Sequence, residues 1–287
     1  MKGCNGFSIT AALLWGINYP LVKAVLHIVP ESTFLAIRFS LASVLFLAYL
    51  LLSGESLRVR REHFAPILLL GLLGVGLYNI VWTYGIHKTT SANAALLISA
   101  SPIFTGVYSL MTGAEKMRPK KWLGTLTAFA GICVIVSWTP GARFSLASEL
   151  FIGNALMVVG SLLFSFYAVL AKPLLQYYSP AKLTTLAMLA GTPVILAYAA
   201  LQGVDMTVSY SAAIWTGLIY IVVLGTIVAF IFWYKGVKQT SPFQTVVFHF
   251  IVPVMSMIMG ALFLGEAVNG EMLLGAILVF IGLATVS

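Results

Sequence analysis

The sequence predicts an all-α integral membrane protein in which ten transmembrane helices form two inverted five-helix repeats (5+5). The prediction rests on an apolar composition, on ten apolar segments of spanning length, and on a sequence pattern that occurs twice. The chain has 287 residues, of which 60% are hydrophobic and 8% are charged. A water-soluble domain normally has about 25% charged residues, so this chain could not cover a surface that faces water. The lipid bilayer is therefore its expected solvent, and membrane lipid is an expected partner.

The ten apolar segments are each close to the length that a bilayer-spanning helix needs, which is roughly 20 residues. They cover 7–28, 32–52, 66–87, 92–112, 122–138, 150–171, 182–201, 212–234, 243–264 and 271–287. The connections between them are short, so we expect no extramembrane domain. The first segment is too long for a cleaved signal peptide and lacks a small-residue cleavage site.

Positive charge is concentrated in alternate connections between these segments. One set of chain ends and connections holds Lys2, Arg58, Arg60, Arg61, Lys116, Arg118, Lys120, Lys121, Lys172, Lys182, Lys235 and Lys238. The other set holds only Lys88 and Arg143. The positive-inside rule assigns the richer set to the cytoplasm, and both termini belong to that set. No loop is large enough to form a nucleic-acid-binding surface, so no nucleic-acid partner is expected.

A pattern of proline, glutamate, tryptophan and glycine occurs twice, at a constant offset of 151 residues. Pro102 matches Pro253, and Glu115 matches Glu266. The same offset pairs Trp82 with Trp233, Gly124 with Gly275, and Gly131 with Gly282. General hydrophobicity explains chance matches of Leu and Val, but it does not explain matches of these residue types. The matched glycines are seven residues apart on one helix face, where small residues let helices pack closely.

The duplication divides the chain into an N-terminal repeat, 1–145, and a C-terminal repeat, 146–287. Each repeat contains five predicted helices, an odd number, so the second repeat enters the membrane from the opposite face. Inverted repeats are typical of secondary transporters, because a site between two equivalent halves can open to either side. The sequence therefore favours transport by alternating access.

Three prolines inside predicted helices are candidate hinges: Pro20, Pro102 and Pro253. A proline within a helix leaves the carbonyl four residues earlier without its usual hydrogen bond. For Pro102 and Pro253 these carbonyls belong to Ile98 and His249. Such breaks occur in membranes where other groups bind the freed backbone, or where the backbone lines a cavity. A plain kink that helps helices pack is the alternative interpretation.

Aromatic, amide and hydroxyl side chains that share helix faces are the candidate lining of a substrate cavity. Spacings of three and four residues fall on one face of a helix. The candidates are Trp15, Asn18, Tyr19, Tyr78, Asn79, Trp82, Ser99, Ser101, Tyr167, Phe230, Trp233, Gln244 and His249. They lie too deep for all of them to belong to the aromatic belts at the membrane surface. Such a cavity suits a small amphipathic solute, for example an amino acid with an apolar or aromatic side chain.

Few ionisable residues lie inside the predicted helices. All eight acidic residues lie at helix ends or in loops, which argues against a site built for cations. Lys23 and Arg38 either extend to the membrane surface, or one of them meets a substrate carboxylate near the outer mouth. His249 is either hydrogen-bonded to a neighbouring helix or part of the cavity wall, where its charge can change near neutral pH. No nucleophile–base pair or metal-ligand cluster lies at mid-membrane, so we expect neither an enzyme nor a metal or cofactor site.

The stretch PIFTGVYSLMTGAEKMRPKKWLGTLTAFAGI, its second copy and LLWGINYPLVKAV with AIRFSLA resemble the EamA-type transporters of the drug/metabolite transporter superfamily. The resemblance covers the whole chain and implies a ten-helix exporter of small metabolites. The chain is most similar to bacterial aromatic amino-acid exporters, which implies export of amino acids across the inner membrane. The fused halves remove the need for a dimer, so a monomer is expected. A multidrug exporter of lipophilic or cationic compounds is the alternative function.

Overall fold

The computed structural model describes residues 6–89, 91–113, 115–138, 148–204, 210–264 and 267–286. Every regular element in these ranges is a helix, and they contain no strand. Eight helices of the described chain are long and apolar enough, by length and composition, to cross a membrane. Two shorter apolar helices, Leu96–Met111 and Gly270–Val286, correspond to the remaining predicted segments. The all-helical, membrane-type character that the sequence predicts is therefore confirmed.

The described residues of the first half of the chain form seven α-helical segments and one π-helical segment. These are α1 (Gly6–Leu26), α2 (Glu31–Leu52), α3 (Arg61–Gly71), η1 (Leu72–Leu77), α4 (Tyr78–Lys88), α5 (Ser91–Ile98), α6 (Ser101–Met111) and α7 (Pro119–Trp138). The segment η1 is a π-helical turn that joins α3 and α4 into one continuous helix.

The second half of the chain has a similar order of elements. These are α8 (Ser148–Leu174), α9 (Pro180–Gln202), α10 (Ala212–Val222), η2 (Val223–Val228), α11 (Ala229–Gln239), α12 (Pro242–Val246), η3 (Val247–Phe250), α13 (Ile251–Leu264) and α14 (Gly270–Val286). The π-helical segment η2 begins at Val223 and η1 begins at Leu72, which is again an offset of 151 residues. A rare local conformation therefore recurs at the offset at which the sequence pattern recurs.

The helices are interrupted close to two of the predicted prolines. Pro102 is the second residue of α6, which follows the end of α5 at Ile98. Pro253 lies in the first turn of α13, directly after the 3₁₀ segment η3. The carbonyl of Ile98 accepts a hydrogen bond of 3.4 Å from the hydroxyl of Ser161 in α8. The chain is thus interrupted at Pro102 and a side chain binds the freed carbonyl, whereas the hinge role stays a prediction.

Pro20 lies inside α1, which continues through it. The carbonyl four residues earlier, that of Gly16, accepts a hydrogen bond of 3.1 Å from the hydroxyl of Ser256 in α13. A neighbouring helix therefore satisfies the backbone group that the proline frees.

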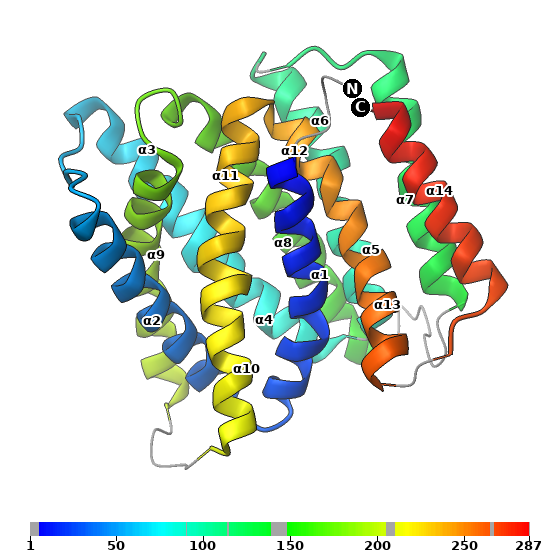
Figure 1. Cartoon of the computed structure of the whole chain (residues 1–287), viewed down its shortest axis with the longest axis horizontal. Coiled ribbons are helices and arrows are strands. Elements are labelled where there is room, and N and C mark those ends of the chain that lie inside the picture. The colour runs from blue at the N-terminus through cyan, green and yellow to red at the C-terminus, as the bar shows by residue number, and fades with distance from the viewer. Residues whose placement is uncertain are drawn as a thin grey trace.

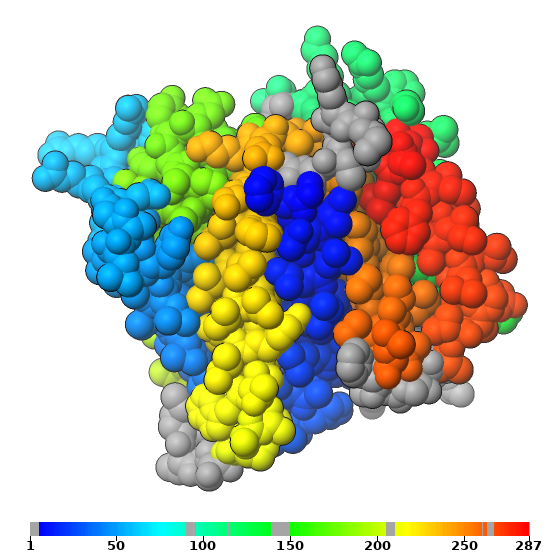
Figure 2. All heavy atoms as spheres, in the orientation of Figure 1, coloured from blue at the N-terminus to red at the C-terminus, as the bar shows by residue number. Residues whose placement is uncertain are grey.

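The helices pack side by side with α1 near the centre of one face, between α11 and α13 (Figures 1 and 2). The helices α7 and α14 form a pair at one edge (Figure 1). Their matched glycines face each other, because a Cβ atom on Gly131 would meet the carbonyl oxygen of Gly275, and one on Gly124 that of Gly282. The predicted packing role of these glycines is confirmed.

The beginning of α1 and the end of α14 lie at the same end of the bundle (Figure 1). The connections that follow α2, α6, α8 and α11 lie at this end too (Figure 1). We call it the basic end, because these connections and the adjoining helix ends hold Arg58, Arg60, Arg61, Lys116, Arg118, Lys120, Lys121, Lys172, Lys182 and Lys238. It is the end that the sequence assigns to the cytoplasm.

Candidate functional site

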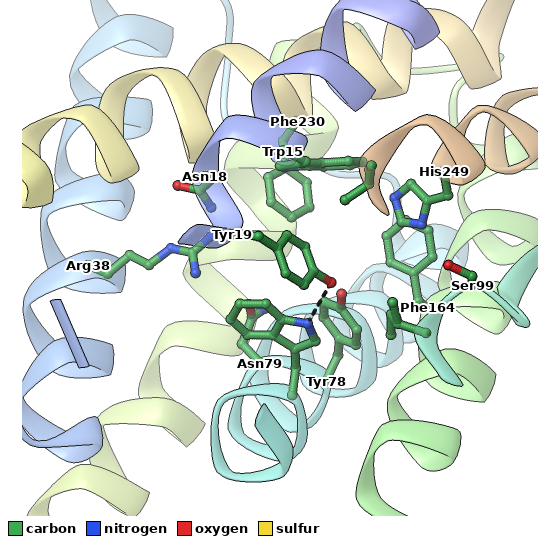
Figure 3. A pocket seen from close by; sticks show the side chains of 13 residues that line it. Trp15, Asn18, Tyr19, Arg38, Tyr78, Asn79, Ser99, Phe164, Phe230 and His249 are labelled. Carbon is green, nitrogen blue, oxygen red and sulfur yellow. Dashed lines mark hydrogen bonds between the residues drawn. The ribbon is translucent and has the colours of Figure 1, made fainter. Parts of the chain in front are cut away.

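A cavity of about 50 Å³ lies between helices from both halves of the chain (Figure 3). Nine of the predicted residues line it: Trp15, Asn18, Tyr19, Tyr78, Asn79, Trp82, Ser99, Phe230 and His249. Arg38, Ile98, Phe164 and Val252 complete the lining. The residues come from α1, α2, α4, α8, α11 and α13 and from the interrupted segments near Ile98 and His249. The cavity therefore lies where the two broken helices meet the continuous ones.

Hydrogen bonds to backbone carbonyls of the two π-helical segments fix two of the lining side chains. The indole nitrogen of Trp15 donates to the carbonyl of Gly225 in η2, at 3.0 Å. The amide nitrogen of Asn79 donates to the carbonyl of Val75 in η1, at 2.8 Å. Because π-helical turns leave their backbone carbonyls irregularly paired, they can accept these bonds and hold the side chains toward the cavity.

Tyr19 and Trp82, both in the cavity lining, link α1 to α4 through a hydrogen bond that Figure 3 draws as a dashed line. The indole nitrogen of Trp82 donates to the hydroxyl of Tyr19 at 3.1 Å, and the two rings meet edge to face with centroids 5.3 Å apart. A cavity of about 50 Å³ has room for only a few water molecules. An amino acid therefore fits only after lining side chains such as these two move apart.

His249 stands among aromatic rings in the cavity wall. Its imidazole stacks on Phe164, with centroids 4.3 Å apart and planes at 14°, and meets Trp15 edge to face at 5.0 Å. Its Nε2 atom is buried and has no hydrogen-bond partner among the described residues. Of the two alternatives that the sequence leaves open for His249, the structure favours the cavity wall.

Four predicted residues lie outside the lining. Tyr167 and Trp233 stack on each other, with centroids 5.4 Å apart, and both are fully buried. Ser101 is a buried residue at the start of α6, and Gln244 is half-buried in the short helix α12. Helical spacing identifies the face that these residues share with the lining, but it does not give their height along the helix.

Two lining residues differ from the sequence prediction. Phe164 is absent from the predicted set, although it lies one turn before Tyr167 on the same face of α8. Arg38, expected near the outer mouth, instead lines the central cavity and is 4% exposed. Lys23 is exposed, as expected for a side chain that extends to the membrane surface.

Among the described residues, the cavity lining holds no Asp or Glu. The carboxylates of the described residues lie elsewhere: Glu31 pairs with His87, Glu62 with Arg60, Glu115 with Lys121, and Glu55 accepts a bond from Ser179, while Glu271 begins α14. The predictions for Asp205 and Glu266 lie outside the described residues, as does the side chain of Glu149. Arg38 is thus the charged group of the cavity as the structure describes it.

A larger cavity, of about 630 Å³, lies against the outer sides of α6 and α8. It is lined mainly by apolar side chains and includes Met111, which is 78% exposed. Its one charged lining residue, Lys172, is bonded to the carbonyls of Val237, Lys238 and Thr240 at the end of α11. The charged group of this surface cavity is therefore already bound to backbone carbonyls of the chain.

The sequence matches the model of a known family twice. The EamA-like transporter family model matches residues 4–137 and again residues 151–287. The chain belongs to the EamA-like transporter family. The two matches cover nearly the whole chain and correspond to the two copies of the sequence pattern.

Relatives in this family are similar along most of their length. The chain is 26% identical over 270 residues to an uncharacterized transporter of Archaeoglobus fulgidus, covering 94% of this chain and 92% of that one. It is 24% identical over 285 residues to the uncharacterized transporter YyaM of Bacillus subtilis, covering 98% and 91%. It is 26% identical over 263 residues to the uncharacterized inner membrane transporter YedA of Escherichia coli, covering 90% and 81%.

A solved protein structure shares the fold of this EamA-family chain. It superposes with a TM-score of 0.82 at 21% sequence identity, and the match covers 99% of this chain and 96% of the other. At this identity the likeness shows the fold alone. Together with the family match, it identifies the chain as a multi-pass membrane protein of a transporter family.

Proposed function

We propose that this protein exports amino acids, those with aromatic or other apolar neutral side chains, from the cytoplasm across a bacterial inner membrane. Transport follows alternating access between two inverted repeats, 1–145 and 146–287, and the functional unit is a monomer. The observation that supports this most is the chemistry of the central cavity. It combines aromatic rings with two amides, one buried cation and no acidic side chain among the described residues.

The side chain and the carboxylate of an amino acid each have a counterpart in this lining. The rings of Trp15, Phe164 and Phe230 offer apolar and aromatic surface for the side chain. Asn18, Asn79 and Arg38 offer hydrogen-bond donors for the carboxylate. Small-solute sites usually have this composition, with mostly apolar walls and a few polar groups that fix orientation.

The alternative, a multidrug exporter of lipophilic or cationic compounds, is less well supported. A site for organic cations is expected to hold a carboxylate, because an unpaired charge inside a membrane is strongly unfavourable. The lining instead holds Arg38, whose positive charge repels a cation. An apolar cavity of this kind still leaves neutral lipophilic compounds to be tested directly.

The repetition of local structure supports alternating access. The π-helical segments η1 and η2 and the helix breaks near Pro102 and Pro253 occur at matched positions of the two halves. If the halves exchange conformations, the cavity opens to one side and then to the other. The small volume of the cavity means that its lining has to move apart during the transport cycle.

The test is transport by the purified protein in liposomes. Labelled phenylalanine, threonine and methyl viologen are offered separately, and uptake is compared with that of protein-free liposomes. The proposal predicts uptake of phenylalanine, and slower or no uptake of methyl viologen. Uptake of methyl viologen without either amino acid would replace the amino-acid proposal by the multidrug alternative.

A further inference from the structure

We propose that the cavity recognises its substrate through the carboxylate, which binds Arg38, and that the α-amino group contributes no ion pair. The substrate class then includes aromatic monocarboxylates that lack an amino group. This inference rests on the proposed function, because it assumes that the central cavity is the substrate site. It deepens that proposal by naming the group that the site recognises.

Arg38 is a buried cation without a counter-charge in the described part of the chain. It is 4% exposed, and no described acidic residue forms a salt bridge with it. Its guanidinium lies near the rings of Phe34 and Phe39, at 5.8 and 5.1 Å from the ring centroids. A buried charge is strongly unfavourable unless it is paired, so an anion in the cavity offsets this energy.

The terminal nitrogens of Arg38 remain available to a ligand. A guanidinium has five N–H donors, and one of them, on Nε, binds the hydroxyl of Thr226 at 3.0 Å. No other hydrogen bond joins Arg38 to the described residues, and Figure 3 shows the guanidinium pointing into the cavity. The two terminal nitrogens have the spacing of a carboxylate's two oxygens, which they bind through two parallel hydrogen bonds.

Thr226 fixes the position of this guanidinium. Its hydroxyl is fully buried and donates to the carbonyl of Ile221 at 2.9 Å, so its oxygen is oriented to accept from Arg38. Thr226 belongs to the π-helical segment η2, and Arg38 belongs to α2. Thr226 is therefore a positioning residue for the carboxylate site.

Asn18 adds a second donor beside Arg38. The Oδ1 atom of Asn18 lies against Gly225, where a Cβ atom would clash with it. Figure 3 shows the amide nitrogen of Asn18 turned toward the guanidinium of Arg38 and the cavity. The Oδ1 atom has no hydrogen-bond partner among the described residues, and the amide nitrogen together with the guanidinium offers donors that suit an anion.

The aromatic wall lies on the opposite side of the cavity. Figure 3 shows Arg38 on one side and His249, Phe164 and Ser99 on the other. A carboxylate bound to Arg38 therefore directs the substrate's side chain toward the stacked rings of Phe164 and His249. The α-amino group finds only neutral groups in the described lining, so its removal loses neutral hydrogen bonds at most.

The inference predicts an order of affinities for three related compounds on the wild-type protein. The dissociation constant of 3-phenylpropanoate, which lacks the amino group, should lie within about tenfold of that of phenylalanine. Phenethylamine, which lacks the carboxylate, should bind at least about 100-fold more weakly, because it leaves the guanidinium unpaired. Isothermal titration calorimetry of the purified full chain in detergent measures all three without relying on any variant.

The outcomes separate this inference from the proposed function. Transport of phenylalanine without binding of 3-phenylpropanoate would overturn the inference and leave the proposed function intact. Binding of 3-phenylpropanoate without transport of phenylalanine would overturn the proposed function and leave the recognition of the carboxylate intact. Phenethylamine binding as tightly as phenylalanine would also overturn the inference, and the failure of all three compounds to bind would overturn both.

Variants test the roles of Arg38 and Thr226. The readout is the ratio of the dissociation constants of 3-phenylpropanol, the neutral alcohol, and 3-phenylpropanoate, which isolates the carboxylate from general packing. Arg38→Gln should bring this ratio close to one, and Arg38→Lys should retain part of it. Thr226→Val should lower the ratio by about tenfold, and Thr226→Ser, which keeps the hydroxyl, should restore it.

The matched control is Thr125→Val. Thr125 is also fully buried, and its hydroxyl donates to a backbone carbonyl, that of Lys121, within α7. It lies outside the cavity lining, so the ratio should stay at the wild-type value. Equal ratios for Thr226→Val and Thr226→Ser would show that the hydroxyl does not position Arg38.

Discussion

Arg38 in α2 donates a hydrogen bond of 3.0 Å from Nε to the hydroxyl of Thr226 in η2, 188 residues further along the chain. The two residues belong to the two stretches that match the family model separately, 4–137 and 151–287. The bond therefore joins the charged group of the cavity to the π-helical turn of the other half. A motion that separates α2 from η2 must break this bond or shift the guanidinium.

Replacing Arg38 should leave the stability of the protein unchanged or higher and should lower its transport activity. Arg38→Gln removes a buried charge that has no counter-charge among the described residues, so the melting temperature in detergent should equal or exceed that of the wild type. Transport of phenylalanine should fall at least about 100-fold, because the carboxylate loses its charged partner. Arg61→Gln, at the exposed start of α3, is the control and should change neither quantity. A large loss of melting temperature in Arg38→Gln would instead assign Arg38 a structural role.

The link between Tyr19 and Trp82 should stabilise the contracted cavity. Tyr19→Phe leaves the buried indole N–H of Trp82 without its acceptor, which should lower the unfolding free energy by about 1–3 kcal/mol. Tyr49→Phe is a matched control, because Tyr49 is 52% exposed on α2. Denaturant unfolding in mixed micelles measures both variants. Equal stability of the two variants would mean that the link contributes nothing to the folded state.

The close contact of α7 and α14 should tolerate no added side chain at Gly131. A Cβ atom there would meet the carbonyl oxygen of Gly275 and the backbone nitrogen of Val279. Gly131→Ala should therefore force the helices apart and lower the unfolding free energy by about 1–3 kcal/mol. Gly270→Ala is the control, because a Cβ atom there meets nothing within 4 Å. The pair lies outside the cavity lining, so the KM for phenylalanine should stay unchanged, and a changed KM would contradict this placement.

Transport should be independent of a proton gradient. The described cavity lining holds no carboxylate, and Arg38 keeps its charge at any relevant pH, which leaves His249 as the titratable group for coupling. We expect facilitated transport, in which the flux of phenylalanine into liposomes does not depend on an imposed pH gradient, either for the wild type or for His249→Gln. A wild-type flux that follows the gradient, together with loss of this response but not of exchange in His249→Gln, would show proton coupling through His249.

Much of the fold could be predicted from the sequence, because its determinants are local. Apolar length predicts a spanning helix, and the helices are interrupted near Pro102 and Pro253 as their prolines predict, although α1 continues through Pro20. The π-helical segments η1 and η2 have no such signal in the sequence. They arise where an extra residue is accommodated inside a continuous helix, and the sequences LLGVGL and VLGTIV contain no proline that would reveal it.

The candidate site could be predicted only in part, because spacing gives the face of a helix and not its depth or tilt. Tyr167 and Phe164 share a face of α8, yet Phe164 reaches the cavity and Tyr167 packs behind it against Trp233. Arg38 lies only two turns from the start of α2, and from the sequence this favours a position near the outer mouth. Its position in the cavity depends on how α2 packs against η2, which is a tertiary contact that no local pattern contains.

The most direct test of the central claim is counterflow of labelled phenylalanine in liposomes that contain the purified wild-type protein. The liposomes are loaded with unlabelled phenylalanine, and matched sets are loaded with 3-phenylpropanoate or with phenethylamine. The account predicts that label accumulates against internal phenylalanine and against internal 3-phenylpropanoate, and that it does not accumulate against phenethylamine. Accumulation against phenethylamine alone, or no accumulation against any of the three compounds, would contradict it.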